Sequence, residues 1–166
     1  MSAISIANKD WSIIDDVKTA LGGATVGGSA VFAAVTAGTS DAQAEECQFT
    51  ATPAAIVRYL GTTEHRTPGG HLACAILLEV IVAAKVSAGG ADESARLQEV
   101  LRLTNAAKNA VNADKPADPC AWGDDDRTVV PIEFGSPKLD TAQAAPWAVG
   151  RLPLTVRYVL ESDTSH

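Results

Sequence analysis

The sequence predicts a single α+β domain in which helices pack on one face of a mostly antiparallel sheet. Three observations favour this class: two segments with the apolar spacing of helices, several segments with the polarity pattern of strands, and the order in which they follow one another. With 166 residues, the chain has about the length of one domain and can bury one substantial core. No repeat, low-complexity tail or linker divides it, so we expect one domain over residues 1–166.

Two amphipathic helices are expected. Residues 10–21 carry apolar side chains at helical spacing, and Gly22-Gly23 follows as a stop signal. In the second segment, residues 91–113, Asp92 and Glu93 suit the positive N-terminal end of a helix. The face expected to be buried comprises Trp11, Ile14, Val17 and Leu21 in the first helix, and Leu97, Val100, Leu101, Thr104, Ala107 and Val111 in the second.

The first half of the chain also holds strand signals. Residues 30–35 form a short strand or a buried apolar run, and residues 53–60 are rich in β-forming side chains. A turn-rich loop, TTEHRTPGG, precedes a long segment at residues 71–86, whose even-numbered positions are apolar while Glu79 lies on the other face. We expect the two longer segments to pair as a hairpin across the loop.

Two further strands, each with an internal proline, are expected after a polar loop at residues 114–126. They are residues 127–135, with Pro131, and residues 152–160, with Pro153. In the last strand every second side chain, from Leu152 to Leu160, is apolar and is expected to pack onto the helices. Because Pro153 lacks an N–H, it belongs at a sheet edge, at a bulge or at the beginning of a strand; we interpret the run as an edge strand.

Charge and composition exclude several classes of function. Thirteen basic and twenty acidic residues give a net charge of -7, which disfavours binding to nucleic acid or to an anionic membrane surface. The most hydrophobic stretch, residues 72–84, is too short to span a bilayer and contains Glu79. The N-terminus does not resemble a signal peptide. Three cysteines without a CxxC pair predict reduced thiols in a cytoplasm rather than a disulfide framework.

Several ligand-binding patterns are incomplete. The segment GGATVGG, residues 22–28, lacks the Lys-Ser or Lys-Thr of a phosphate loop and follows a helix, so we interpret it as a helix stop and a loop. His65, His71 and Cys74 lack a fourth zinc ligand, and Asp124–Asp126 lack the alternation of an EF-hand. No metal or cofactor is therefore expected.

No catalytic constellation is evident. Ser29 and Ser136 do not match G-x-S-x-G, and Cys120, in a proline-containing loop, is interpreted as a loop anchor. We therefore expect a protein that is not an enzyme.

The three tryptophans differ in their surroundings. Trp11 has the spacing of a core residue, whereas Trp122 and Trp147 lie beside prolines and glycines, where large aromatics also serve as contact anchors. Core packing is the favoured role for each.

Four segments, in this order, resemble the tail terminator proteins of tailed bacteriophages and the neighbouring tail-completion and head-tail connector proteins. The segments are PAAIVRYLGTTEH, LLEVIVAAKV, ARLQEVLRLTNAAKNAV and WAVGRLPLTVRYVLE. The similarity covers most of the chain and is one of pattern, without a catalytic motif.

The resemblance implies a structural virion protein, assembled in the host cytoplasm. Its subunits would form a homohexameric ring that caps the tail tube, stops tube polymerisation and provides the surface on which the head docks. The implied partners are other copies of this chain, the tail tube protein and a head-tail connector or neck protein. DNA would pass through the channel without specific binding, which an acidic subunit suits because it repels phosphate. No membrane partner is implied.

The last strand supplies the candidate contact residues for such an assembly. Its odd-numbered face, opposite the one expected to pack on the helices, is available to a neighbouring subunit. The candidates are Trp147, Arg151, Pro153 and Arg157. A second hypothesis is a stand-alone α+β domain that binds a ligand or performs hydrolysis around Cys120 or His71.

Overall fold

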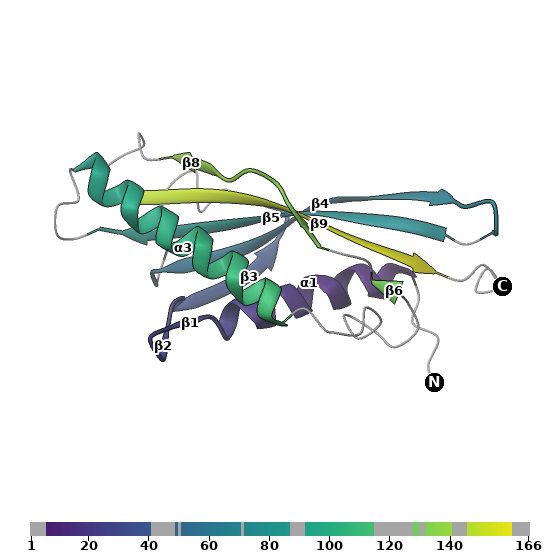
Figure 1. Cartoon of the computed structure of the whole chain (residues 1–166), viewed down its shortest axis with the longest axis horizontal. Helices are drawn as coiled ribbons and strands as arrows, with labels where there is room; N and C mark the ends of the chain where they lie inside the picture. The colour runs from purple at the N-terminus through teal and green to yellow at the C-terminus, as the bar shows by residue number, and fades with distance from the viewer. Residues whose placement is uncertain are drawn as a thin grey trace.

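The structure, a computed structural model, describes residues 6–40, 49, 51–70, 72–86, 92–114, 128–129, 132–140 and 146–160. Two long helices and nine strands make up these parts of the chain (Figure 1). In chain order they are α1 (Ile6–Gly22), β1 (Thr25–Val26), β2 (Ser29–Ala30), β3 (Ala34–Gly38), β4 (Ala54–Arg66), β5 (Leu72–Lys85), α3 (Glu93–Asp114), β6 (Thr128–Val129), β7 (Glu133–Phe134), β8 (Lys138–Asp140) and β9 (Trp147–Leu160).

Seven strands form the main sheet. Its order is β3-β4-β5-β9-β6, and the short strands β7 and β8 also pair with β9. Only β3 and β4 are parallel among the described pairs; the others are antiparallel, and β1 and β2 form a separate hairpin. The predicted α+β class and the predicted β4–β5 hairpin are therefore confirmed.

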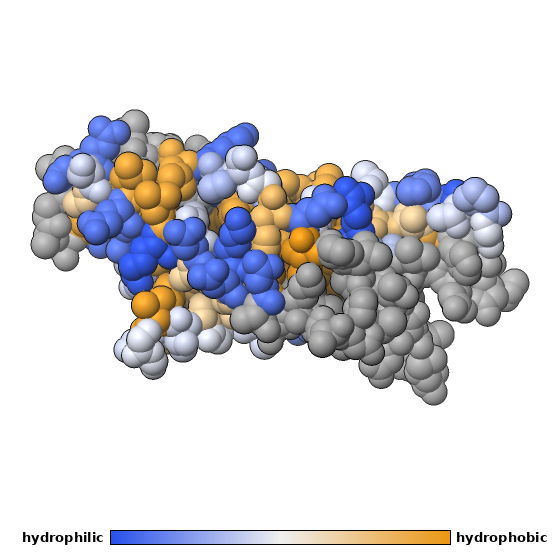
Figure 2. Space-filling model, viewed as in Figure 1, coloured by the Kyte–Doolittle hydropathy of each residue, from blue (hydrophilic) through white to orange (hydrophobic). Residues whose placement is uncertain are grey.

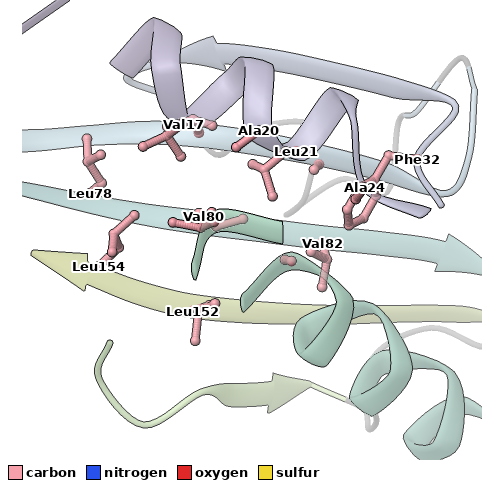
Figure 3. Packing of buried hydrophobic residues seen from close by; sticks show 14 of the residues in the cluster. Val17, Ala20, Leu21, Ala24, Phe32, Leu78, Val80, Val82, Leu152 and Leu154 are labelled. Carbon is pink, nitrogen blue, oxygen red and sulfur yellow. The ribbon is translucent and has the colours of Figure 1, made fainter. Parts of the chain in front are cut away.

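Both helices pack on the same face of this sheet, as predicted. Figure 3 shows Val17 and Leu21 of α1 directed toward the side chains of Leu78 and Val80 on β5. All four side chains are at most 1% exposed, and each fully buried Val or Leu contributes about 1.5–3 kcal/mol relative to an exposed one. The alternation in the last strand is confirmed from Leu152 through Tyr158, whose even-numbered residues join this aliphatic core.

The predicted core role of Trp11 is wrong, because its side chain is 54% exposed. The buried face of α1 is centred on Val17 and includes Ile13 and Leu21. Trp11 lies six positions before Val17, which places it about 120° around a helix of 3.6 residues per turn. Apolar residues at helical spacing therefore do not by themselves determine which side of the helix packs on the sheet.

The buried face of α3 is also turned from the predicted one. Leu97 and Leu101 are 40% and 39% exposed, whereas Leu103, which was not predicted, is fully buried. Figure 2 shows the resulting apolar surface over the N-terminal half of α3. The stripe that meets the sheet and α1 comprises Val100, Leu103, Thr104, Ala107 and Val111.

The loop expected at residues 62–70 is shorter, because β4 continues to Arg66 and pairs there with Leu72. A β-bulge interrupts the alternation of inward and outward side chains, so the sequence pattern does not show that the strand continues. The register shifts between Tyr59 and Gly61, leaving Leu60 as the extra residue, and Gly61 has φ +141°, a conformation that favours glycine. Before the bulge the odd-numbered residues of β4 face the helices, and after it the even-numbered residues face them.

The glycine-rich segment forms a helix end and a hairpin, as its mismatch to a phosphate loop indicated. Gly27 and Gly28 have φ values of 60° and 83°, which suit the two-residue turn between β1 and β2. The run predicted at residues 30–35 is divided: β2 ends at Ala30, two buried residues follow, and β3 begins at Ala34.

The expected strand at residues 127–135 is interrupted into β6 and β7, and the segment expected to link it to the last strand contains β8. Pro131 and most of the loop at residues 114–126 lie outside the described residues.

The interpretation of the last strand as a sheet edge is wrong. β9 pairs with β5 along its full length on one side and with β6, β7 and β8 on the other. Pro153 is accommodated inside the sheet because its backbone nitrogen, which lacks a hydrogen, does not face β5. Its carbonyl accepts the Gly135 N–H at 2.9 Å, and the nitrogen of the same residue points to the same side, toward the gap between β7 and β8. A Cβ on Gly135 would lie 3.0 Å from the Pro153 Cβ, so glycine allows this close approach.

Candidate functional site

The four predicted contact residues lie on one surface, the sheet face opposite α1 and α3, which we call the helix-free face. Trp147, Arg151, Pro153 and Arg157 are odd-numbered residues of β9, whereas the even-numbered ones from Leu152 to Tyr158 pack under the helices. Neither described helix covers the face that these four side chains share.

A row of three charged side chains crosses the middle of this face. Glu79 on β5 accepts hydrogen bonds at Oε1 from Arg58 on β4, at 3.2 Å, and from Arg151 on β9, at 3.1 Å. Their side chains retain between 15% and 27% of their accessible surface. Arg58 also donates its Nε–H to the carbonyl of Thr39, just beyond β3, at 3.1 Å. The row thus links four neighbouring segments of the sheet.

The row carries one negative and two positive charges in a chain whose net charge is -7. Both guanidinium groups share one carboxylate oxygen, and all three side chains are partly shielded from water. The sequence indicated Arg151 and the orientation of Glu79 but missed Arg58, because its position depends on the hairpin register.

Apolar surface lies next to the charged row. Leu77 is 37% exposed on the helix-free face because the residue paired with it on β4 is Gly61, which offers no side chain to cover it. On β9 its cross-strand neighbour is Thr155, followed by the half-buried Pro153. Protein interfaces are enriched in arginine, and the centre of an interface is more apolar than the rest of the surface. The arginines and apolar side chains of this face match that composition.

The two ends of the face differ. At one end Trp147 packs against Phe49, with ring centroids 5.6 Å apart, near the second apolar cluster of Ile56, Ile81, Ala83 and Val149. This contact fits the packing role favoured for Trp147. At the other end Arg157 pairs with Glu133 at 3.4 Å, and both side chains are at least half exposed. Arg157 is thus the more accessible contact candidate.

A second polar cluster lies on the opposite, helix-covered side. Asp10 of α1 accepts the hydroxyl of Tyr158 at 2.9 Å on Oδ1, and the hydroxyls of Thr62 and Tyr59 at 2.9 and 3.4 Å on Oδ2. Tyr59 and Thr62 also contact each other at 2.5 Å. One carboxylate therefore fastens the first helix to β4 and β9. No local sequence pattern indicates this cluster, because its members are far apart in the chain.

Cys74 lies beside this cluster and is a free, buried thiol. Burial raises its pKa above the ordinary value, Glu64 and Asp10 act in the same direction, and a hydrogen bond with Tyr158 opposes them. Burial and the hydrogen bond to Asp10 also raise the pKa of Tyr158. Such a thiol is largely un-ionised at neutral pH and has the character of a small core residue rather than a nucleophile.

We expect Cys74 to react slowly with a neutral alkylating reagent at pH 8, and faster as the pH rises above about 9, because the thiolate is the reacting form. Mass-spectrometric labelling of a Cys47→Ser, Cys120→Ser variant measures this rate. Equal rates in buffer and in denaturant would contradict the assigned environment.

The same shifts predict how stability depends on pH. The folded-state pKa values of Cys74 and Tyr158 lie above their unfolded values. The contribution of these two groups to the free energy of unfolding is therefore fully present at neutral pH and falls as the solution becomes alkaline.

Among the candidate catalytic and metal-binding residues that the structure describes, His65 and Cys74 are not brought together. His65 pairs with Ala73 and Glu64 with Cys74, so His65 and Cys74 extend from opposite faces of the hairpin. Ser29 and Ser136 are exposed, while His71, Cys120, Trp122 and Asp124–Asp126 lie outside the described residues. Within the described parts of the chain, no three His, Cys, Asp or Glu side chains could hold a metal ion.

A groove of about 570 Å³ lies between the end of α1, β1 and α3. Small and neutral side chains line it, including Ala20, Thr25 and Asn109, and none of its lining residues is titratable. The Thr19 and Thr25 hydroxyls therefore have no acidic or basic side chain beside them among the described lining residues.

No protein-family model matches the chain, and no curated protein matches its sequence. Neither described helix is long and apolar enough to cross a membrane.

Proposed function

We propose that this protein is a ring-forming structural subunit of a phage-type tail, a tail terminator that caps the tail tube and offers the surface on which the head docks. The observation that carries the proposal is that the contact residues expected from the sequence share one helix-free sheet face with the Arg58–Glu79–Arg151 row. The resemblance of the sequence pattern to phage tail terminator proteins is the reason for proposing a ring as the kind of assembly.

The composition of the helix-free face supports an assembly role. It presents partly shielded guanidinium groups, an exposed leucine and a proline on rigid strands rather than on loops. Rigid, mixed polar and apolar surfaces suit subunit contacts because little conformational entropy is lost when they are covered.

The acidic balance of the chain supports the proposed passage of DNA through a channel. A net charge of -7 repels phosphate over the range of the Debye length, about 8 Å at physiological ionic strength. Such a ring does not retain DNA in transit.

Electron microscopy and native mass spectrometry of the purified protein test the proposal, together with addition of the protein to growing tail tubes. We expect rings, and tubes whose length stops increasing once their ends are capped. A monomer at high concentration that leaves tube growth unchanged, and whose melting temperature rises with a small molecule, would favour the ligand-binding hypothesis instead.

Replacing Arg157 by Glu is expected to reduce ring formation while leaving the fold intact. The ion pair with Glu133 is exposed and contributes no more than about 1 kcal/mol, whereas charge reversal at a subunit contact adds repulsion. Ring mass and melting temperature are the two measurements.

Arg102→Glu is the matched control. Arg102 also pairs with a glutamate, Glu99, at 2.6 Å, and is 43% exposed, but it lies on α3, away from the helix-free face. Equal ring formation by the two variants would remove Arg157 from the interface.

A further inference from the structure

The outer edge of β3 is the feature that carries a further inference. β3 is the last strand at one end of the sheet, and no described strand lies on its outer side. The Pro53 carbonyl accepts the Ala33 N–H at 2.7 Å, so Pro53 and every second residue after it direct their backbone groups toward β3. In the parallel register Val35 lies opposite Ala55, so the backbone groups of Ala55 and Val57 bond to the even-numbered residues of β3. The residues of β3 whose N–H and C=O point outward are therefore Val35 and Ala37.

This edge carries none of the usual protection against strand addition. Exposed edges are commonly blocked by charged side chains, prolines or bulges. Residues 29–40, SAVFAAVTAGTS, contain no charged residue and no proline, and β3 pairs with β4 without a register shift. Thr36 and Gly38, on either side of Ala37, are exposed and small, so another backbone can approach this edge closely.

The opposite end of the sheet is built differently. There β6, β7 and β8 are only two or three residues long, and the close contact between Gly135 and Pro153 separates β7 from β8. One molecule thus has two unlike edges at opposite ends of one sheet. Unlike surfaces that meet head to tail are what a closed ring requires.

Strand directions are compatible with that contact. β3 runs parallel to β4 and β9, and β8 is antiparallel to β9, so β8 of a copy placed in line would meet β3 antiparallel. Arg58 reaches the carbonyl of Thr39 at the end of β3, so a copy paired there would adjoin the charged row on the helix-free face.

We propose that β3 pairs, through the outward backbone groups of Val35 and Ala37, with an extended strand of a second copy of this chain. The choice of a second copy rests on the proposed function. The backbone complementarity itself requires only an extended segment.

Ala37→Pro tests the pairing, because it removes an outward N–H that the β3–β4 ladder does not use. Ala37→Ser, which keeps that N–H, is the matched control. We expect Ala37→Pro to weaken association about tenfold or more, by analytical ultracentrifugation, and Ala37→Ser to associate like the wild type. If the proline variant misfolds, Thr36→Lys introduces the charge that blocks natural edges without changing the backbone.

Hydrogen exchange of the wild-type protein gives an independent measurement. The amides of Val35 and Ala37 should exchange about tenfold or more slowly in the assembly than in the dilute monomer, while those of Thr36 and Gly38 are protected in both. Rings whose Val35 and Ala37 amides stay unprotected would overturn the pairing but leave the proposed function intact. Protected amides in an oligomer that does not cap tail tubes would support the pairing and overturn the function.

Discussion

Gly150→Ala is expected to lower the free energy of unfolding by about 2–3 kcal/mol, through overpacking beneath α3. Gly150 is buried in β9, and a Cβ built there would lie 2.7 Å from Val100 Cγ2 and 3.0 Å from Thr104 Cγ2. Real Cβ atoms essentially never approach other atoms as closely as 2.7 Å, so the Val100 side chain, or α3 with it, must shift. Thermal unfolding measures the change, which corresponds to about 4–12 °C for a chain of this length.

Gly38→Ala provides the matched control, since a Cβ there meets nothing within 4 Å. The nearest atom to the new methyl group in Gly150→Ala belongs to Val100, so Val100→Ala should make room for it. We expect the double variant to be more stable than the sum of the two single changes indicates. Strict additivity would contradict close packing of α3 on Gly150.

Asp10→Ala is expected to cost about 2–3 kcal/mol, because it leaves the hydroxyls of Tyr158, Thr62 and Tyr59 without their charged acceptor. The Tyr158 residue is only 1% exposed, so water cannot readily replace the carboxylate there. Denaturant titration followed by circular dichroism measures the loss.

Asp15→Ala separates this effect from helix propensity. Asp15 is exposed on the same helix, so both changes gain the same intrinsic preference of alanine, but only one removes the polar cluster. A double-mutant cycle of Asp10→Ala with Tyr158→Phe should give a coupling of about 1 kcal/mol or more. Equal stability of the Asp10 and Asp15 variants would show that the cluster does not fasten α1.

The elements predicted correctly are those with a long periodic signal. Both helices, the hairpin and the inward face of β9 each rest on several repeats of one spacing, which local contacts then reinforce. The short strands β7 and β8 contain two and three residues, too few for any period to be visible. Without these strands the sequence predicts β9 at an edge, whereas β3, the terminal strand of the described sheet, is predicted only as a short strand or a buried run.

The candidate site was predictable only in part, for a related reason. The alternation along β9 placed Arg151 and Arg157 on one face, which the structure bears out. Their partners Glu79 and Glu133 come from other strands, and such pairings depend on register. The polar cluster at Asp10 depends on three segments meeting, which no local pattern encodes.

The bulge in β4 also bears on how the length of this chain can change. Leu60 is the extra residue, so deleting it would join Tyr59 to Gly61 and leave each later pair, such as Thr62 with Ile76, facing as it does now. A deletion at most other positions of β4 would reverse the faces of the residues beyond it and detach Thr62 from Asp10. Position 60 is therefore where the hairpin can shorten by one residue over evolutionary time without exchanging its two sides.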